Sequence, residues 1–167
     1  MKNILKFIFF VTVLTTTGFG SIASEQSQKL LNPGWSFKGF FGKFDRSSLQ
    51  RGYQVYTEVC AACHSMKYLS YRNLAQQGGP EFSEDQAKII ASQFEVIDGP
   101  NSEGDMFTRP ARLSDNFVGP YANEEAAKSA NGGAYPPDMS VLVKARKGGA
   151  SYIYSILLGY DDPPPDI

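Results

Sequence analysis

A five-residue stretch, CAACH at residues 60–64, constrains this chain more than any other feature. It contains Cys60 and Cys63, the only two cysteines, and His64, the only histidine among 167 residues. Two thiols three positions apart with an adjacent imidazole can form a disulfide, a redox-active dithiol, a zinc site or an attachment point for a c-type haem. The rest of the sequence has to discriminate among these four chemistries.

The N-terminal residues predict that the protein is exported. Residues 1–6 carry two lysines and no acid, residues 7–14 are apolar, and a Ser-Ile-Ala tripeptide offers small side chains for cleavage. This order is typical of a secretory signal peptide, and the apolar run is shorter than the roughly 20 residues that a membrane-spanning helix needs. We therefore expect a signal peptide over residues 1–23 and one mature domain over residues 24–167.

Charge gives no indication of a nucleic-acid partner. The whole chain has a net charge of −1, and removing residues 1–23 takes away two lysines and no acid, which leaves −3. A nucleic-acid-binding domain normally carries a basic patch.

Export also affects the cysteines, because thiols outside the cytoplasm are usually oxidised. A disulfide between cysteines so close in sequence would constrain the unfolded chain very little.

Helix caps and apolar stripes predict a mainly α fold of short helices. The predicted helices lie at residues 45–60, 83–94, 123–131, 140–147 and 151–158. Residues 35–44 (WSFKGFFGKF) follow neither a helical nor a strand period and predict an irregular segment packed through its rings. Residues 98–123 predict a long loop, and no alternating strand pattern stands out. Long structureless loops are uncommon unless something orders them, which a large cofactor would do.

The first predicted helix leads directly into the cysteine motif. Leu49, Tyr53, Tyr56 and Cys60 fall on one helical face. Gly52 lies in the middle of this helix, where it costs about 1 kcal/mol relative to Ala. We expect this glycine to allow the close approach of a second element.

The sequence contains every residue that covalent haem attachment requires. A thioredoxin-type dithiol would need a strand–turn–helix context, whereas this motif follows a predicted helix. Tetrahedral zinc would need a fourth ligand, and no other Cys or His exists. A c-type haem needs two thiols for its vinyl groups and an adjacent His for its iron. We therefore predict one covalent haem c per chain, with a structural CxxC or a metal site as alternatives.

Longer stretches of the chain resemble the cytochrome c1 family, the haem subunits of ubiquinol–cytochrome c reductase. They include WSFKGFFGKFD, LQRGYQVYTEVCAACHSMKYLSYRNL, DGPNSEGDMFTRPARLSDNF, PYANEEAAKSANGGAYPPDMSVLVKARKGG and YIYSILLGYDDPPP. The resemblance covers nearly the whole mature sequence in family order. It implies a c-type cytochrome fold, in which short helices and long loops wrap around a covalent haem.

The resemblance also implies which residues hold the haem. Cys60 and Cys63 would form the thioethers, and His64 would be the proximal iron ligand. The pocket would further include Asn131, Ala134, Pro136, Pro137, Arg146, Tyr152 and Ile156, with the arginine beside a haem propionate.

These pocket residues have simpler interpretations as well. Pro136 and Pro137 are also compatible with a plain helix stop, and Arg146 with a solvated cation at a helix end. Tyr152 and Ile156 would look the same in any core. Arg109 fits a surface position or an ion pair equally well, and we do not assign it to the haem.

The resemblance places further parts of the family beyond this chain. The family's distal methionine ligand, its last core helix and its C-terminal membrane anchor follow the DPPP sequence, and this chain stops before them. We therefore expect a C-terminally incomplete sequence or a degraded gene product, with a second polypeptide that supplies the rest as the other possibility. Met66 follows His64 too closely to reach the opposite face of the ring. Met106 and Met139 are expected to pack as gap fillers.

The function implied by the resemblance is electron transfer, performed by a carrier subunit that is not an enzyme by itself. The donor would be the Rieske iron–sulfur protein, the acceptor a soluble or membrane-bound cytochrome c, and cytochrome b a further partner. We expect the periplasmic face of a bacterial inner membrane as the location. Acidic residues that would attract a basic cytochrome c are Asp98, Glu103, Asp105, Glu124 and Glu125.

One alternative function remains open from the sequence alone. A haem whose sixth iron position stays open would bind a small gas or show weak peroxidase activity. A reduced-state spectrum with and without carbon monoxide discriminates between such a protein and a six-coordinate electron carrier.

Overall fold

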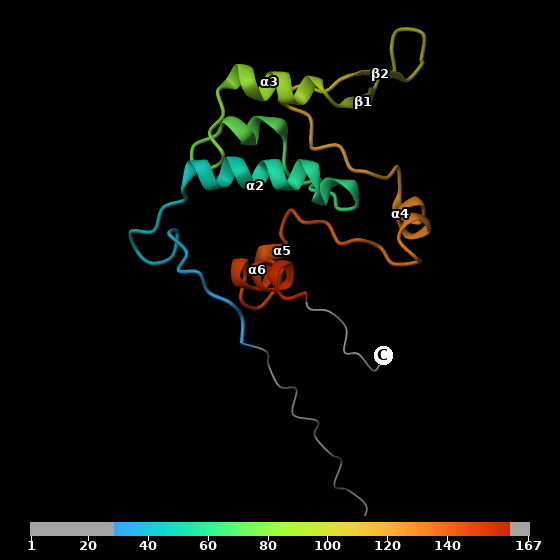
Figure 1. Ribbon diagram of the computed structural model, residues 1–167. Helices are drawn as coiled ribbons and strands as arrows, with labels where there is room; N and C mark the ends of the chain where they lie inside the picture. The colour runs from blue at the N-terminus through green and yellow to red at the C-terminus, as the bar shows by residue number, and fades with distance from the viewer. Residues whose placement is uncertain (1–28, 161–167) are drawn as a thin grey trace, which may run out of the picture.

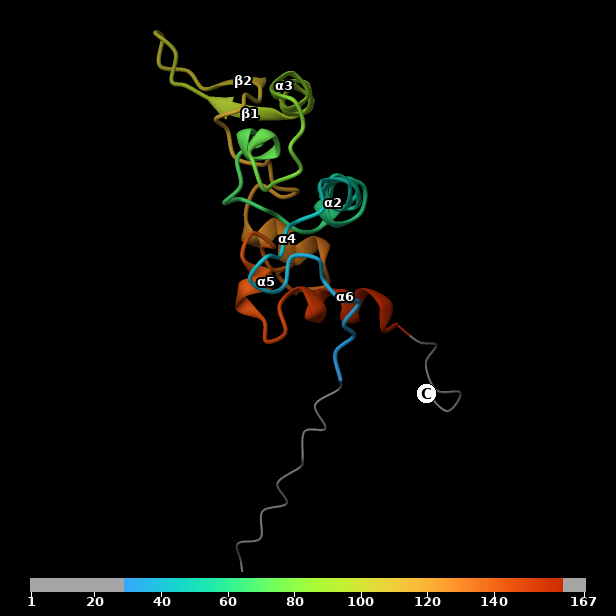
Figure 2. The same cartoon turned by 90° about the vertical axis from the view of Figure 1, so that its left-hand side faces the viewer.

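The computed structural model describes residues 29–160, so the predicted signal peptide lies outside the described residues. In chain order the elements, with η for 3-10 helices, are α2 (Arg46–Glu58), η1 (Cys60–Ala62), η2 (Tyr71–Ala75), α3 (Glu84–Ser92), β1 (Glu95–Asp98), β2 (Phe107–Pro110), α4 (Glu124–Ala130), α5 (Leu142–Ala145) and α6 (Ala150–Leu158). Helices α2 and α3 lie in one part of the molecule, and α5 and α6 lie below α2 in both views (Figure 1, Figure 2). The predicted mainly α architecture of short helices and long connections is confirmed.

Helix α2 begins where the sequence predicts and ends slightly earlier. The Asp45 carboxylate accepts a hydrogen bond of 2.7 Å from the backbone N–H of Ser48, which satisfies a free donor of the first turn. Hydrogen bonds from Ser48 also lower the pKa of Asp45. The helix stops at Glu58, and Cys60 opens the 3-10 turn η1. A Cβ added at Gly52 would meet nothing within 4 Å, so within residues 29–160 no second element makes the expected close approach.

The buried core lies between η2 and α3. Tyr71 and Leu74 of η2 pack with Ala87 and Ala91 of α3, and each is at most 3% exposed. Phe117 joins them from the loop after β2, with its ring centroid 4.9 Å from that of Tyr71. The small alanines let the 3-10 helix approach α3 closely, and the aromatic rings fill the remaining volume.

The other predicted helices form with small differences in length. A capping box of Ser83 and Gln86 starts α3, and the Asn123 side chain accepts from the N–H of Ala126 at 2.9 Å to start α4. Helix α5 has only four residues, because glycines follow it closely and no side chain caps its N-terminus. Within residues 29–160, no helix is long and apolar enough to cross a membrane.

A β-hairpin interrupts the region predicted as one long loop, so that part of the prediction is wrong. Strands β1 and β2 pair in antiparallel fashion, with Val96 opposite Arg109 and Ile97 opposite Thr108. Each strand has only four residues and no buried side chain. A pattern this short carries little periodicity, and tertiary ion pairs stabilise the hairpin instead.

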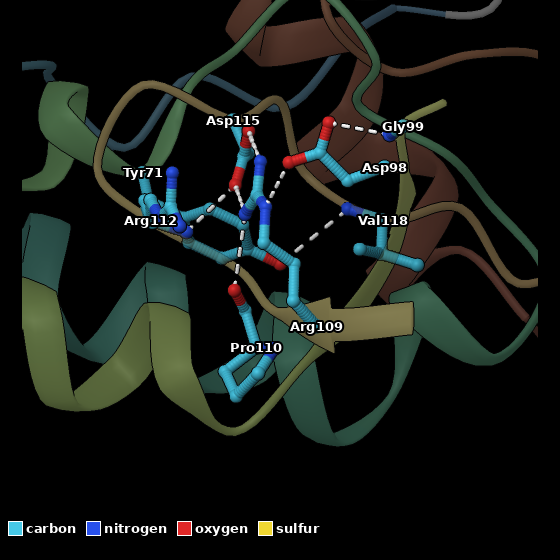
Figure 3. A network of polar contacts seen from close by, with 8 residues as sticks. All are labelled: Tyr71, Asp98, Gly99, Arg109, Pro110, Arg112, Asp115 and Val118. Carbon is cyan, nitrogen blue, oxygen red and sulfur yellow. Dashed lines mark hydrogen bonds and ion pairs between the residues drawn. The ribbon is translucent and has the colours of Figure 1, made fainter. Parts of the chain in front are cut away.

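Arg109 joins both arms of the hairpin to the loop that follows (Figure 3). Its Nη1 and Nη2 atoms donate to the Asp115 carboxylate at 2.6 and 3.1 Å, and its Nε donates to Asp98. The arginine side chain is only 16% exposed. Its hydrogen bonds hold the pKa values of Asp98 and Asp115 below their usual range. Of the two interpretations open for Arg109, the ion pair is the one that the structure shows.

An aromatic cluster connects the irregular segment 35–44 with α6. The Trp35 ring stacks on Phe37 at 5.4 Å between centroids and meets the edge of Tyr154 at 5.6 Å. The indole Nε1 donates a hydrogen bond of 2.9 Å to Ser151 Oγ. The prediction of an irregular segment packed through its rings is therefore confirmed for Trp35 and Phe37. Phe40, by contrast, points outward and is 95% exposed.

Candidate functional site

The two cysteines and the histidine lie on one tight turn at the end of α2. Both the N–H of Cys63 and the N–H of His64 donate to the carbonyl of Cys60, at 3.1 and 2.8 Å. The cysteines are free thiols, and all three side chains are half-buried. The disulfide alternative is therefore not formed. Nor do three or more His, Cys, Asp or Glu groups converge on a metal position within residues 29–160.

The ring of His64 is oriented by a residue far along the chain. Its Nδ1 atom lies 2.8 Å from the carbonyl oxygen of Pro137. A carbonyl can only accept, so Nδ1 carries the proton and the Nε2 atom presents a free lone pair. A neutral imidazole in this tautomer is a ready ligand for iron, and the carbonyl partner raises its basicity.

A phenol supports the same turn from α2. The Tyr56 hydroxyl donates to the backbone carbonyl of His64 at 3.3 Å. Burial raises the pKa of Tyr56 to about 12, so the phenol remains a neutral donor at physiological pH. The predicted helical face of α2 thus fixes the histidine backbone directly.

The carboxylate of Asp138 clips the loop that bears Pro137 onto the chain after His64. One oxygen accepts from the Ser65 hydroxyl at 2.8 Å and from the N–H of Lys67 at 3.0 Å. The other accepts from the N–H of Ser140 at 2.9 Å. Sequence reasoning missed this residue, although Asp two positions before Ser in a proline-rich loop is a signal for a side-chain-stabilised turn.

Two hydrogen bonds from backbone N–H groups reinforce this contact. The N–H of Met139 donates to the Ser65 carbonyl at 2.8 Å, and the N–H of Tyr68 donates to Ser140 Oγ at 3.1 Å. Burial opposes the ionisation of Asp138, but hydrogen bonds from Ser140, Lys67 and Ser65 outweigh it and lower the pKa to about 2. The Asp138 carboxylate that holds this loop, the clip, is therefore fully ionised at neutral pH.

A cavity of about 270 Å³ opens beside the cysteine turn. Its lining joins Cys63 with Tyr121, with Ala127 of α4, and with Tyr135 and Pro136 of the loop after α4. Three separate segments of the sequence thus line one cavity beside the Cys63 thiol. Aromatic and aliphatic groups share the wall of this cavity with the polar side chains of Ser65, Lys67, Asn123 and Glu124.

Comparison with known proteins identifies the family. The model of the Cytochrome C1 family matches residues 35–167. The chain belongs to the cytochrome c1 family.

Relatives of the chain come from mitochondria and bacteria. It is 49% identical to "Cytochrome c1 1, heme protein, mitochondrial" of Arabidopsis thaliana over 159 residues, which covers 94% of this chain and 51% of that protein. It is 50% identical to cytochrome c1 of Rhodospirillum rubrum over 148 residues, 89% of this chain and 53% of that protein. It is also 50% identical to "Cytochrome b-c1 complex catalytic subunit, mitochondrial" of Candida albicans over 131 residues, 78% of this chain and 44% of that protein. This cytochrome c1 family chain spans about half the length of the curated relatives it matches.

The donor set of this cytochrome c1 chain fits a c-type haem. Two free thiols lie on the same turn as an imidazole whose Nε2 is free. Covalent attachment needs reduced thiols, and axial ligation needs the tautomer that Pro137 enforces. Cys60, Cys63 and His64 are thus able to hold haem.

Of the other predicted residues, Asn131, Ala134, Pro136 and Pro137 lie in the loop that faces the cysteine turn. The Asn131 side chain ends α4 by donating to the Ala127 carbonyl at 2.7 Å and to the Tyr121 hydroxyl at 3.1 Å. Its direct role in the structure is to shape this loop. The N–H of Ala134 in turn donates to the Asn131 carbonyl at 3.1 Å.

Arg146, Tyr152 and Ile156 lie in the other part of the molecule, the arginine directly after α5 and the other two on α6. Arg146 follows α5 with an exposed side chain, Tyr152 is half-buried, and Ile156 is 42% exposed. Within residues 29–160, no hydrogen bond connects these three residues with the cysteine turn. Their haem contacts stay a prediction.

Proposed function

We propose that this chain binds one haem c and carries electrons as the cytochrome c1 part of a ubiquinol–cytochrome c reductase. The observation that carries the proposal is the hydrogen bond from His64 Nδ1 to the Pro137 carbonyl, beside two free thiols. Cys60 and Cys63 would hold the porphyrin, and Nε2 of His64 would bind its iron. Membership of the cytochrome c1 family supports the same conclusion.

Attachment of the porphyrin requires only addition chemistry from the cysteines. Cys60 and Cys63 would each supply a thiol S–H to one vinyl C=C bond, so that a C–S bond would form and the hydrogen would go to the neighbouring carbon. The step is redox-neutral and consumes no oxidant. Two such covalent bonds would prevent the haem from dissociating, which benefits an exported protein.

The chain's own residues would set the redox properties of the site. The haem iron supplies a one-electron ferric–ferrous couple when it is bound. The Pro137 carbonyl makes His64 a stronger donor, which favours the ferric state. Tyr135 and Pro136 would exclude water from the ring, which favours the ferrous state. No substrate bond is made or broken by this chain in the proposed role.

The remaining predicted residues would complete the pocket. Pro136, Pro137 and Ala134 offer a rigid surface poor in donors on the side of His64. Arg146 would pair with a propionate, because a guanidinium binds carboxylates with two hydrogen bonds. Tyr152 and Ile156 would cover apolar parts of the ring from α6.

The partners and the location follow from the proposed role. The donor would be a Rieske iron–sulfur protein, the acceptor a cytochrome c, and cytochrome b a neighbour in the complex. The chain would work at the periplasmic face of a bacterial inner membrane after export. The name of the Candida relative, a b-c1 complex subunit, supports membership of such a complex.

Haem staining after denaturing electrophoresis tests the attachment. The exported wild-type chain should retain the stain, and the Cys60→Ala/Cys63→Ala variant should lose it. Ser102→Ala, at an exposed position of the hairpin loop away from the cysteine turn, is the control and should keep it. Covalent haem in the double variant would contradict the proposal.

Carbon monoxide tests the electron-carrier role separately. In the assembled reductase, a carrier with both axial positions filled should show a reduced spectrum that carbon monoxide does not change. A large spectral change would favour the alternative, a five-coordinate haem protein that binds small gases.

A further inference from the structure

Two neighbouring phenylalanines protrude from the segment that precedes α2. Phe40 is 95% exposed and Phe41 is 89% exposed, the highest values among the large apolar residues of the described range. Their rings meet edge to face, with centroids 5.0 Å apart. Single exposed apolar residues are common on protein surfaces, but a fully exposed pair of phenylalanines is not.

The other aromatic residues of the same segment pack against one another. Phe37 stacks on Phe44 at 4.9 Å and on Trp35 at 5.4 Å, and Trp35 is anchored to Ser151 of α6. Within ten residues of chain, three rings therefore form a base and two form a tip. The outward direction of Phe40 and Phe41 is a property of the tip alone.

Backbone hydrogen bonds hold the tip in place. At its neck, the N–H of Lys43 donates to the Ser36 carbonyl at 3.1 Å, and Ser36 Oγ donates to the Lys43 carbonyl at 3.0 Å. At its turn, the N–H of Gly42 donates to the Gly39 carbonyl at 3.1 Å.

Both glycines are required by this geometry. Gly39 has a φ of +91°, and a Cβ on Gly42 would lie 2.4 Å from the backbone of Phe37. The loop, which Figure 1 shows in pale blue leading into α2, thus presents its phenylalanines in a fixed conformation. A preformed tip loses little entropy when it binds.

The charge around the tip has one sign. Lys38 and Lys43 flank the two phenylalanines, both are exposed, and residues 29–44 contain no Asp or Glu. This lysine-only stretch occurs in a chain whose net charge is −1. The first acid after it, Asp45, accepts from Ser48 at the start of α2.

A pair of apolar rings between two cations matches the boundary of a lipid bilayer. Phenylalanine enters the region between headgroups and acyl chains, while lysine extends its ammonium group to anionic headgroups. A protein partner fits less well, because a stable protein interface buries about 800 Å² on each side. Two side chains on a convex tip provide only a small part of such an area.

We infer that the tip formed by residues 38–43 inserts Phe40 and Phe41 into the surface of an anionic membrane. The inference is independent of haem binding, since it rests on a loop outside the cysteine turn. It gives the folded domain a shallow attachment to lipid. The tip would also limit how the domain is oriented above the bilayer.

Flotation with lipid vesicles tests the inference on the haem-loaded chain. The wild-type chain should float with vesicles that contain phosphatidylglycerol and bind much less to pure phosphatidylcholine. Phe40→Ser/Phe41→Ser should weaken binding at least tenfold. Ile97→Ser, which removes an apolar residue 74% exposed on β1, is the matched control and should bind as the wild type does.

The lysines and the depth of insertion give two further readouts. Lys38→Gln/Lys43→Gln should remove most of the salt dependence of binding. A Phe41→Trp variant should gain tryptophan fluorescence that brominated lipids quench more strongly than they quench the Trp35 fluorescence of the wild type. Unchanged circular dichroism and haem content would show that each variant is folded.

Three results would overturn the inference. The first is a wild-type chain that does not bind anionic vesicles. The second is a Phe40→Ser/Phe41→Ser variant, correctly folded, that binds as tightly as the Ile97→Ser control. The third is protection of the tip by other subunits of the complex without any affinity for lipid, which would assign the loop to a protein interface.

Discussion

The Nδ1 atom of His64 lies 2.8 Å from the carbonyl oxygen of Pro137, 73 residues further along the chain. This contact fixes both the tautomer and the orientation of the ring. It depends on the Asp138 carboxylate, which binds Ser65 and Lys67 on one side and Ser140 on the other. The iron-ligand geometry of the proposed site is therefore set by a loop that the carboxylate holds in place.

Replacing Asp138 with Asn should loosen this loop. The amide keeps the shape of the side chain but loses the charge and one acceptor, so an N–H or O–H of the clip loses its partner. We expect the free energy of unfolding to fall by about 1–2 kcal/mol. A weaker bond from His64 to Pro137 should also raise the midpoint potential of the haem, because a less basic ligand stabilises the ferric state less. Denaturant unfolding and a redox titration measure the two effects.

The matched control for this substitution is Asp105→Asn. Asp105 is an exposed aspartate on the hairpin loop whose side chain makes no ion pair within the described residues. It should leave stability and potential unchanged. An Asp138→Asn variant that behaves like this control would mean that the clip does not position the histidine.

Acid should weaken the same contact within a defined pH range. The pKa of Asp138 is lowered from 3.8 to about 2 in the folded chain. A carboxyl group with a depressed folded pKa stabilises the fold above its unfolded pKa, and this contribution is lost as the pH falls towards the folded value. Stability should therefore decrease between about pH 4 and pH 2. The decrease should be smaller in Asp138→Asn, as measured by unfolding at several pH values, and an equal slope in both proteins would refute the assignment.

The cysteine motif and most helices could be predicted because their determinants are local. Attachment chemistry requires Cys60, Cys63 and His64 at fixed spacing, and side-chain caps at Asp45 and Asn123 mark helix starts in the sequence itself. Such signals need no knowledge of the rest of the fold.

The hairpin and the clip could not be predicted for the opposite reason. The hairpin depends on Arg109 reaching both Asp98 and Asp115, and the clip joins Ser65 to Asp138 across 73 residues. Polar contacts of this kind leave no periodic pattern in the sequence. The outward position of Phe40 likewise could not be distinguished from the half-buried positions of Trp35 and Phe37, since composition does not indicate which face of a loop turns outward.

Removing the charge of Arg109 should destabilise the hairpin without affecting haem attachment. In Arg109→Gln, the carboxylates of Asp98 and Asp115 lose their shared cation and repel each other. We expect the midpoint of thermal unfolding to fall by about 5 °C or more. Arg112→Gln is the control, because Arg112 is exposed and its hydrogen bonds with Asp115 involve only its backbone. Haem staining should be equal in both variants, and a loss of covalent haem in Arg109→Gln alone would contradict this separation.

The hairpin loop also offers a test of how a basic cytochrome c would dock. Of the five acids predicted to attract it, Asp98 is bound by Arg109, and the two on α4 pair with Lys128. Glu103 and Asp105 make no ion pair within residues 29–160, and both are exposed. They are the acids whose charge is least compensated within the described chain.

Neutralising these two acids should slow electron transfer to a basic cytochrome c in the assembled reductase. With Glu103→Gln/Asp105→Asn, the association rate should drop several-fold at low salt and approach the wild-type rate at high salt, because surface charges act through a screened field. Glu58→Gln, an exposed acid at the end of α2 that accepts only from Gln54, shows the effect of removing one charge away from this loop and should change the rate less. Stopped-flow measurement across a salt series checks this. If the double variant and the control have the same salt dependence, docking uses a different face of the domain.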